Sequence, residues 1–266
     1  MRSIVSKKLR TLALGFTAAL LLAGSAHAAE VRVMISGGLS AAYNALVPEF
    51  ERTTGHKVLT AYGPSMGTTV NAIPVRLERG EAADVVIMVG YALGDLVSQG
   101  KVKAESRVDL VKSLIGICVK AGAPKPDVSS PEALKRALLA AKSIAYSDSA
   151  SGVYISTEMF QRLGIAEEMK DKARKIPAEP VAGVVARGEA EIGFQQFSEM
   201  LPIPGIDIVG PLPPELQKVT IFSAGIAGVS KEPEAGTALI KFLASPAARE
   251  TIVKSGLEPI VAGGTN

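Results

Sequence analysis

Apolar residues along the chain fall into two kinds of segment that alternate with each other. Short runs rich in valine and isoleucine predict buried β-strands, whereas longer segments with apolar residues every three or four positions predict helices. Turns rich in glycine, proline and serine separate the two kinds. In the first part of the chain we predict strands over residues 31–35, 57–62 and 84–88, and helices over 39–54, 65–79 and 92–99.

The same alternation continues to the C-terminus, apart from one irregular connection with five prolines over residues 201–214. This rhythm is typical of an α/β protein built on mostly parallel sheets with helices on both faces. The predicted strands cover residues 113–119, 143–146, 191–195 and 218–227. The predicted helices cover residues 131–141, 153–163, 167–175, 181–187, 234–243 and 246–255.

No Gly/Ser-rich linker divides the chain into two consecutive domains. We therefore expect two lobes joined by a chain that crosses between them twice, near residues 108–111 and 223–225. On this interpretation, lobe 1 comprises residues 29–109 and 225–266, and lobe 2 comprises residues 110–224. The two C-terminal helices return to lobe 1.

The first 28 residues have the three parts of a secretory signal peptide. A basic head is followed by an apolar run over residues 12–22 and by a small-x-small cleavage site that ends at Ala28. The apolar run is shorter than the roughly 20 residues that cross a bilayer. A membrane anchor and a buried N-terminal helix are the alternatives. Because Ser25 stands where a lipoprotein has its cysteine, we predict a soluble periplasmic protein that begins at Ala29.

Removal of this leader changes the net charge of the chain and therefore the class of partner that the charge indicates. The whole chain has 29 basic and 26 acidic residues, a formal net charge of +3 and a sequence pI of about 8.9. The leader contains basic residues and no acidic ones, so the remaining chain is close to neutral. Nucleic acid is therefore not an expected partner, because a nucleic-acid-binding surface needs a clustered excess of basic residues.

The residues that carry common catalytic chemistry are scarce after the leader. His56 is the one histidine there, and Cys118 lies in an apolar run where a small buried core residue is expected. No histidine–cysteine metal set, P-loop or dinucleotide-binding motif is present in the sequence. We therefore predict a binding protein that is not an enzyme and uses no metal or cofactor. An exported enzyme on the same fold is the alternative, and an export-linked sensor or chaperone-like module is a third.

Three turns rich in small polar residues each follow a predicted strand and open a predicted helix, at residues 36–40, 63–69 and 147–152. The carboxyl ends of the strands face the ligand crevice in open α/β sheets. A helix start offers unpaired N–H groups, so these turns could together bind an anion. The alternative for any single turn is ordinary helix capping. The candidate ligand hydroxyls in these turns belong to Ser36, Ser40, Ser65 and Ser151.

Several segments make the chain resemble the periplasmic molybdate-binding proteins and the wider type II solute-binding proteins. They are residues 31–58, 80–87, 151–164, 187–193 and 238–248. The resemblance implies a two-lobe fold that closes by a hinge on a ligand held between the lobes. It also implies a monomeric receptor that delivers a small anion to the membrane permease of an ABC transporter. The ligand class is a molybdate- or tungstate-like oxyanion or a small organic carboxylate.

The resemblance also assigns ligand positions. The second ligand serine of the family falls on Ser65, and its backbone donors fall on Ser151 and near Val181. Its first ligand serine falls on Gly38, between Ser36 and Ser40.

Further ligand contacts are expected from Tyr154 and from Gln196, which stands where the family has a tyrosine. A glutamine both donates and accepts hydrogen bonds, which indicates a ligand with donors of its own or a larger ligand. Arg76 and Arg187 could each supply a charge to a carboxylate, but a solvated helix face is the interpretation we favour for both.

Overall fold

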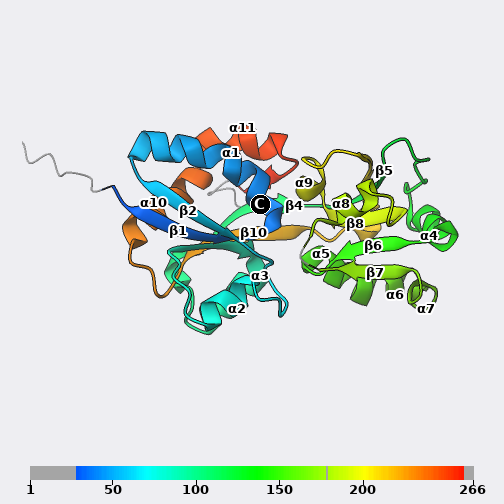
Figure 1. Ribbon diagram of the computed structural model, residues 1–266, viewed down its shortest axis with the longest axis horizontal. Coiled ribbons are helices and arrows are strands. Elements are labelled where there is room, and N and C mark those ends of the chain that lie inside the picture. Colours follow the sequence, from blue (N-terminus) through cyan, green and yellow to red (C-terminus); the bar gives the residue numbers. More distant parts are fainter. Residues whose placement is uncertain (1–27, 178, 261–266) are drawn as a thin grey trace, which may run out of the picture.

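The computed structural model describes residues 28–177 and 179–260, and almost all of the predicted signal peptide lies outside them. These residues form two lobes side by side, each a sheet with helices packed against it (Figure 1). The predicted two-lobe α/β fold is confirmed. Within the described residues, no helix is both long and apolar enough to cross a membrane.

Lobe 1 contains a six-stranded sheet in the order β11-β4-β10-β3-β1-β2. Strands β1, β2 and β3 are parallel, whereas β10, β4 and β11 join by antiparallel pairing. Helices α1 and α11 lie on one side of this sheet, and α2 and α3 lie on the other (Figure 1). The strands are β1 (Glu30–Ile35), β2 (Lys57–Tyr62), β3 (Val85–Val89), β4 (Val108–Ser113), β10 (Thr220–Ile226) and β11 (Glu258–Pro259). The helices are α1 (Gly37–Thr54), α2 (Ile73–Glu78), α3 (Gly90–Ser98), α10 (Pro233–Leu243) and α11 (Arg249–Lys254).

Lobe 2 contains a five-stranded sheet in the order β7-β6-β8-β5-β9. Here β6 is parallel to β7 and β8, and β5 is antiparallel to β8 and β9. The strands are β5 (Ile115–Lys120), β6 (Ile144–Ser147), β7 (Ala173–Ile176), β8 (Ile192–Gln196) and β9 (Ile206–Pro211). The helices are α4 (Pro131–Ala140), α5 (Ala150–Tyr154), α6 (Phe160–Arg162), α7 (Ala166–Met169), α8 (Val181–Ala186) and α9 (Phe197–Met200), and a π-helical turn, Ile155–Met159, joins α5 to α6.

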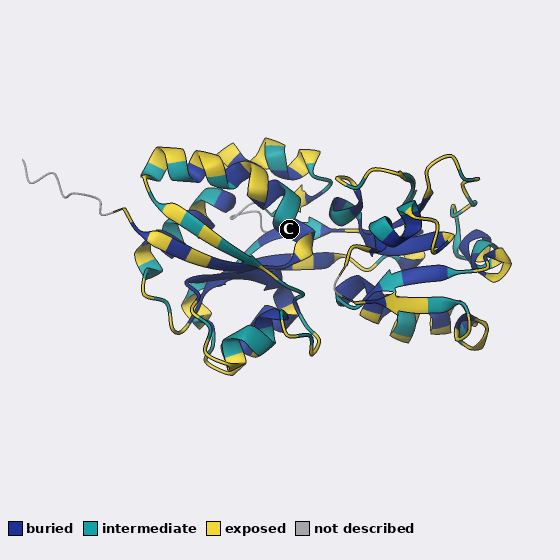
Figure 2. Cartoon of the chain, in the orientation of Figure 1, coloured by how far each residue is buried: buried dark blue, intermediate teal, exposed yellow. Residues whose placement is uncertain are grey.

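The central strands of each sheet are buried, whereas the edge strands β2 and β9 contain no buried residue (Figure 2). All five residues of β3 are buried, as expected of a central strand covered by helices on both sides. In β5, Ile115, Ile117 and Val119 pack into one core cluster of lobe 2, and Cys118 packs into the other. Cys118 is thus the buried core residue that the sequence predicted, and burial raises the pKa of its thiol to about 12.

The chain passes between the lobes a few residues away from the predicted crossings. Strand β4 ends at Ser113 and β5 of the other sheet begins at Ile115, while the return lies between the end of β9 and Thr220. The shift arises because β10 pairs with β4 from Thr220 opposite Ser113, which keeps both strands in lobe 1 up to the crossing.

Three predictions of local structure were wrong. Residues 65–71, predicted as the first part of a helix, form bends and turns, and α2 begins only at Ile73, directly before Pro74, so Ser65 does not open a helix. Residues 173–175, predicted as the end of a helix, belong to the edge strand β7, which exposes Arg174 and Lys175 and so lacks an apolar strand pattern. Residues 206–211, predicted to be irregular, form the edge strand β9. Proline is tolerated at such an edge because not every N–H must pair there.

Helix α9 belongs to lobe 2 in sequence but is fastened to lobe 1. The hydroxyl of Ser198 donates to the carbonyl oxygen of Gly38 over 2.7 Å, and this hydrogen bond is buried. Next to it, the side chains of Phe197 and Leu201 pack closely against Gly256, which follows α11. Residues of α9 therefore lie at the junction of the two lobes.

Candidate functional site

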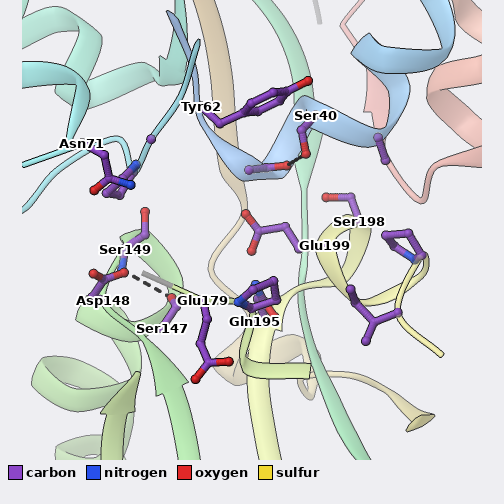
Figure 3. A pocket seen from close by; sticks show the side chains of 17 residues that line it. Ser40, Tyr62, Asn71, Ser147, Asp148, Ser149, Glu179, Gln195, Ser198 and Glu199 are labelled. Atoms are coloured by element: carbon purple, nitrogen blue, oxygen red, sulfur yellow. Dashed lines mark hydrogen bonds between the residues drawn. The ribbon is translucent and has the colours of Figure 1, made fainter. Parts of the chain in front are cut away.

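A cleft of about 360 Å³ opens between the lobes. Its walls come from the β1–α1 turn and the β2–α2 loop of lobe 1, and from the β6–α5 turn, the start of α8 and α9 of lobe 2 (Figure 3). These are mostly places where a strand gives way to a helix, so backbone N–H groups and short polar side chains face the space. The polar lining residues are Ser40, Tyr62, Asn71, Ser147, Asp148, Ser149, Glu179, Gln195, Ser198 and Glu199.

Carboxyl groups supply the formal charge of this lining. Asp148, Glu179 and Glu199 all border the cleft, and none of the described residues that line it is lysine or arginine. Glu179 is paired with Arg187, with 3.0 Å between Oε2 and Nη2. An anionic ligand must therefore be held here by neutral donors, in the presence of the negative charges of Asp148 and Glu199.

Glu199 differs from the other two carboxyl groups in its surroundings. It is partly buried in α9, and its carboxyl group lies against Gly37 at the start of α1, so that Cδ would be 3.0 Å from a Cβ built on that glycine. Burial outweighs hydrogen bonding by Gln195, which acts in the opposite direction, and together with the nearby charge of Asp148 it raises the pKa of Glu199 to about 7. A carboxyl group that titrates near neutral pH can both accept and return a proton.

A much smaller inner cavity, about 10 Å³, adjoins the cleft, and Gly37, Ser149 and Glu199 line both spaces. Four predicted ligand residues line it: Ser36, Gly38, Ser151 and Gln196. Ser36 Oγ and Gln196 Oε1 are buried there and have no hydrogen-bond partner among the described residues. Unpaired buried polar atoms are rare in folded proteins and mark a place where a ligand or water completes the bonding.

The ring of Phe222 accounts for a glycine at position 38. A Cβ built on Gly38 would lie 2.5 Å from Cε2 and 2.7 Å from Cε1 of this ring. A serine therefore cannot occupy this position without moving Phe222, which is buried in β10.

The remaining predicted ligand residues lie at different distances from the cleft. Ser40 lines it, and its hydroxyl donates to the carbonyl oxygen of Gly37 over 2.7 Å. Val181 is buried as the first residue of α8, directly after Pro180 of the lining.

Ser65 and Tyr154 have hydroxyl groups engaged elsewhere. Ser65 is fully buried and its Oγ accepts a hydrogen bond from the Val89 amide over 3.0 Å. The Tyr154 hydroxyl donates to the carbonyl oxygen of Leu216 over 2.5 Å. Neither residue is among those that line the cleft or its inner cavity.

The two candidate arginines are both held by acidic partners. Arg76 pairs with Glu81 at 3.1 Å, and Arg187 pairs with Glu189 at 2.6 Å and with Glu179 of the cleft. Among the described residues, no three histidine, cysteine, aspartate or glutamate side chains are grouped so as to hold a metal ion.

The residues that the sequence analysis missed are Glu199, Gln195 and Asp148. Asp148 lies inside the predicted turn at 147–152, and Gln195 and Glu199 flank Gln196 at the end of β8. Like the predicted serines, these residues lie where a strand ends and a helix starts. No sequence motif marks them as catalytic, because the desolvation of a single carboxyl group is visible only in three dimensions.

We expect Asp148→Asn to lower the pKa of Glu199 from about 7 towards its ordinary value of 4.5. The reason is that removal of a nearby negative charge favours the ionised form of the carboxyl group. Titration of the Glu199 carboxyl carbon by ¹³C NMR measures this directly. Asp171→Asn, at an exposed position, is the control, and an unchanged Glu199 pKa in Asp148→Asn would remove the proposed coupling.

The comparisons with known proteins agree with this architecture. Residues 31–258 match the model of a family described as bacterial extracellular solute-binding protein. The chain belongs to this family. A sulfate-binding protein of the family's fold, SubI from Mycobacterium tuberculosis, superposes with a TM-score of 0.68 at 18% identity, covering 87% of both chains.

Two curated relatives differ in what their names state. The chain is 29% identical to the molybdate-binding protein ModA of Azotobacter vinelandii over 89% of its own length and 92% of the relative's. It is 50% identical to a protein of a Pseudomonas species named aconitate isomerase, over 96% of its own length and 98% of the relative's.

The second relative overturns one prediction. The sequence analysis expected a protein that is not an enzyme, and a relative that shares half of its residues over nearly the whole chain is an enzyme. The expectation was wrong because it relied on the scarcity of histidine and cysteine. A carboxyl group needs neither to act as an acid–base catalyst when burial brings its pKa near neutral.

Proposed function

We propose that this member of the solute-binding family is an isomerase of aconitate or of a closely similar unsaturated tricarboxylate, acting in the cleft between its lobes. The observation that carries the proposal is the partly buried carboxyl group of Glu199, whose pKa is raised to about 7 at the edge of both the cleft and its inner cavity. The relationship to an aconitate isomerase supports it.

The chemistry of aconitate explains why one carboxyl group suffices. The molecule has a carbon–carbon double bond next to a methylene group, and the methylene protons are acidic because the resulting negative charge spreads over the alkene and the neighbouring carboxyl groups. In the proposed reaction, the Glu199 carboxylate removes one of these protons. The electrons of the broken C–H bond form a new double bond to the central carbon.

The same group completes the reaction. The displaced electrons of the original double bond take up a proton at its far carbon, and protonated Glu199 supplies it, which regenerates the carboxylate. Both arms of the molecule end in a carboxyl group, so moving the double bond yields aconitate again. Its geometry is set by the conformation in which the cleft holds the former methylene arm, and no other reactant is consumed.

The neutral donors of the cleft would bind and stabilise the anionic substrate. The start of α1, an 18-residue helix, faces the site with Gly37 and Gly38, and Ser149 faces it from lobe 2. N–H groups at a helix start carry a partial positive charge, which favours carboxylates and the charge that develops when a proton is removed. The volume of the cleft is in the range of small-molecule sites.

Incubation of the purified protein with a single geometric isomer of aconitate tests the proposal. We expect ¹H NMR to detect the other isomer, at a rate proportional to the protein concentration. Saturated tricarboxylates are expected to inhibit, and molybdate and sulfate are expected to bind weakly. Absence of turnover from either isomer would contradict the proposal.

The pH dependence of this reaction follows from Glu199. Because the group must be ionised to remove a proton, kcat/KM is expected to rise as the pH increases through about 7 and then to level off. Initial rates between pH 5 and 9 measure this rising part of the pH profile, its acid limb. A flat profile over that range would show that a carboxyl group with this pKa does not start the reaction.

Delivery of a bound anion to the membrane permease of an ABC transporter is a second candidate function, favoured by the family match and by the molybdate-binding relative. Measurement of uptake of labelled aconitate and molybdate, in cells with and without the gene for this chain, separates the two functions. We further propose that the protein is exported to the periplasm as a soluble monomer. N-terminal sequencing of mature protein that begins at Met1 would contradict export with cleavage after Ala28.

A further inference from the structure

Gln195 is buried at the end of β8, and its amide oxygen has a backbone partner. The backbone N–H of Ala182, in the first turn of α8, donates to Gln195 Oε1 over 3.2 Å. A backbone N–H can only donate, so this contact fixes which end of the side chain is the oxygen. The other end of the amide is therefore the NH₂ donor, and Figure 3 shows Gln195 beside Glu199 in the cleft that both residues line.

Glu199 is held on a second side as well. Its carboxyl group lies against the Cα of Gly37, where any larger residue would displace it. Figure 3 shows the carboxyl group of Glu199 directed into the open space between α1 and the β6–α5 turn, with Gln195 next to it on the lobe 2 side. Helix α9, which carries Glu199, is itself fixed by the buried bond from Ser198 to Gly38.

We propose that Gln195 is a positioning residue: its amide, oriented by the Ala182 N–H, holds the carboxyl group of Glu199 in the cleft and stabilises its ionised form. The proposal rests on the proposed function of Glu199 as the proton-transferring group. The serines and helix starts of the site face the substrate, whereas Gln195 acts on the reaction through Glu199.

The charged groups near Glu199 define what Gln195 must offset. Asp148 faces it from the β6–α5 turn and raises its pKa. Glu179, before α8, is neutralised by Arg187, and Tyr62 of β2 borders the same cleft. Burial and Asp148 both favour the protonated acid, so the NH₂ of Gln195 keeps part of the population ionised at neutral pH.

The test replaces Gln195 with glutamate, which keeps the shape and the acceptor for Ala182 but removes the NH₂ donor and adds a second carboxyl group. Two carboxyl groups that share one site cannot both ionise easily. We expect the acid limb of kcat/KM in Gln195→Glu to move upward by more than one pH unit. Because half of Glu199 is ionised at pH 7 in the parent, a shift of one unit corresponds to a loss of about fivefold at pH 7, with recovery at higher pH.

Gln195→Met provides a second variant of similar size that has no donor and no charge. It is expected to move the limb upward by a smaller amount, and circular dichroism and thermal unfolding verify that both variants fold. Gln161→Glu, at an exposed position of α6, is the matched control and should leave the profile of the parent unchanged.

¹³C NMR titration of Glu199 in the same variants separates this proposal from the proposed function. If the parent protein does not isomerise aconitate but Gln195→Glu raises the Glu199 pKa, the positioning role stands and the proposed reaction fails. If the parent is active and neither Gln195 variant changes the pKa of Glu199 or the acid limb, the positioning role is refuted. An equal shift in Gln161→Glu would also refute it.

Discussion

Replacement of Glu199 by glutamine is expected to reduce kcat for aconitate isomerisation by about 10²–10⁴-fold, the range typical of the loss of a general acid–base group. The expected effect on binding is the opposite. Glu199 carries negative charge in a cleft that already contains Asp148 and no lysine or arginine in its lining. The neutral amide should therefore bind the anionic substrate as tightly as the parent or more tightly.

Steady-state kinetics and calorimetry on Glu199→Gln measure the two effects separately. Glu250→Gln removes a similar charge from an exposed i,i+4 ion pair with Lys254 on α11 and should leave both quantities unchanged. A variant with undiminished kcat would exclude Glu199 as the proton-transferring group. Loss of binding together with loss of folding would be visible as a lowered melting temperature.

The largest effect on stability is expected for Asp84, a buried carboxyl group just before β3. It accepts hydrogen bonds from the backbone N–H groups of Arg32, Lys231 and Glu232 over 2.8, 2.9 and 3.0 Å. The hydroxyl of Ser230 donates to it over 2.8 Å. Through these bonds Asp84 ties β1 to the segment between β10 and α10.

We expect Asp84→Ala to lower the free energy of unfolding by about 3–5 kcal/mol, since each donor left unsatisfied costs about 1–3 kcal/mol and some regain water. Asp84→Asn keeps the shape but loses charge and one acceptor, so a smaller loss is expected. Urea unfolding measures both, with Asp171→Ala at an exposed position as the control. A loss below 1 kcal/mol in Asp84→Ala would contradict the role assigned to these bonds.

The pH dependence of stability gives an independent check on Asp84. Burial alone would raise its pKa, but the four hydrogen bonds outweigh burial and hold the pKa below its ordinary value of 3.8. A group with a lowered pKa in the folded state stabilises the protein above its unfolded pKa. That contribution is lost as the pH falls below about 4, and the parent should lose stability there more steeply than Asp84→Asn.

The sequence predicted the fold well wherever burial left a clear pattern. The fully apolar β3 and the alternation of apolar and polar positions in α1 identify a central strand and a helix that packs on one face. By contrast, β7 exposes both of its central side chains, Arg174 and Lys175, so no apolar pattern distinguishes it from a helix end. An edge strand forms by pairing with a neighbouring strand, and the sequence of the segment itself does not show which strand that is.

The sequence indicated where the candidate site lies, but it did not indicate which group could transfer a proton there. Ser36, Gly38, Ser151 and Gln196 converge on the inner cavity because strand ends meet at one edge of each sheet. Glu199 could not be recognised from the sequence. Its pKa depends on burial against Gly37 and on the charge of Asp148, which lies 51 positions earlier in the chain.

¹H NMR of aconitate with the purified protein in D₂O shows most directly whether the cleft transfers protons. If the cleft between the lobes transfers protons, the second geometric isomer appears and deuterium enters the methylene position of the aconitate pool, and both processes slow together in Glu199→Gln. Stoichiometric binding of aconitate that remains a single isomer and free of deuterium would contradict the account and leave the protein as a receptor.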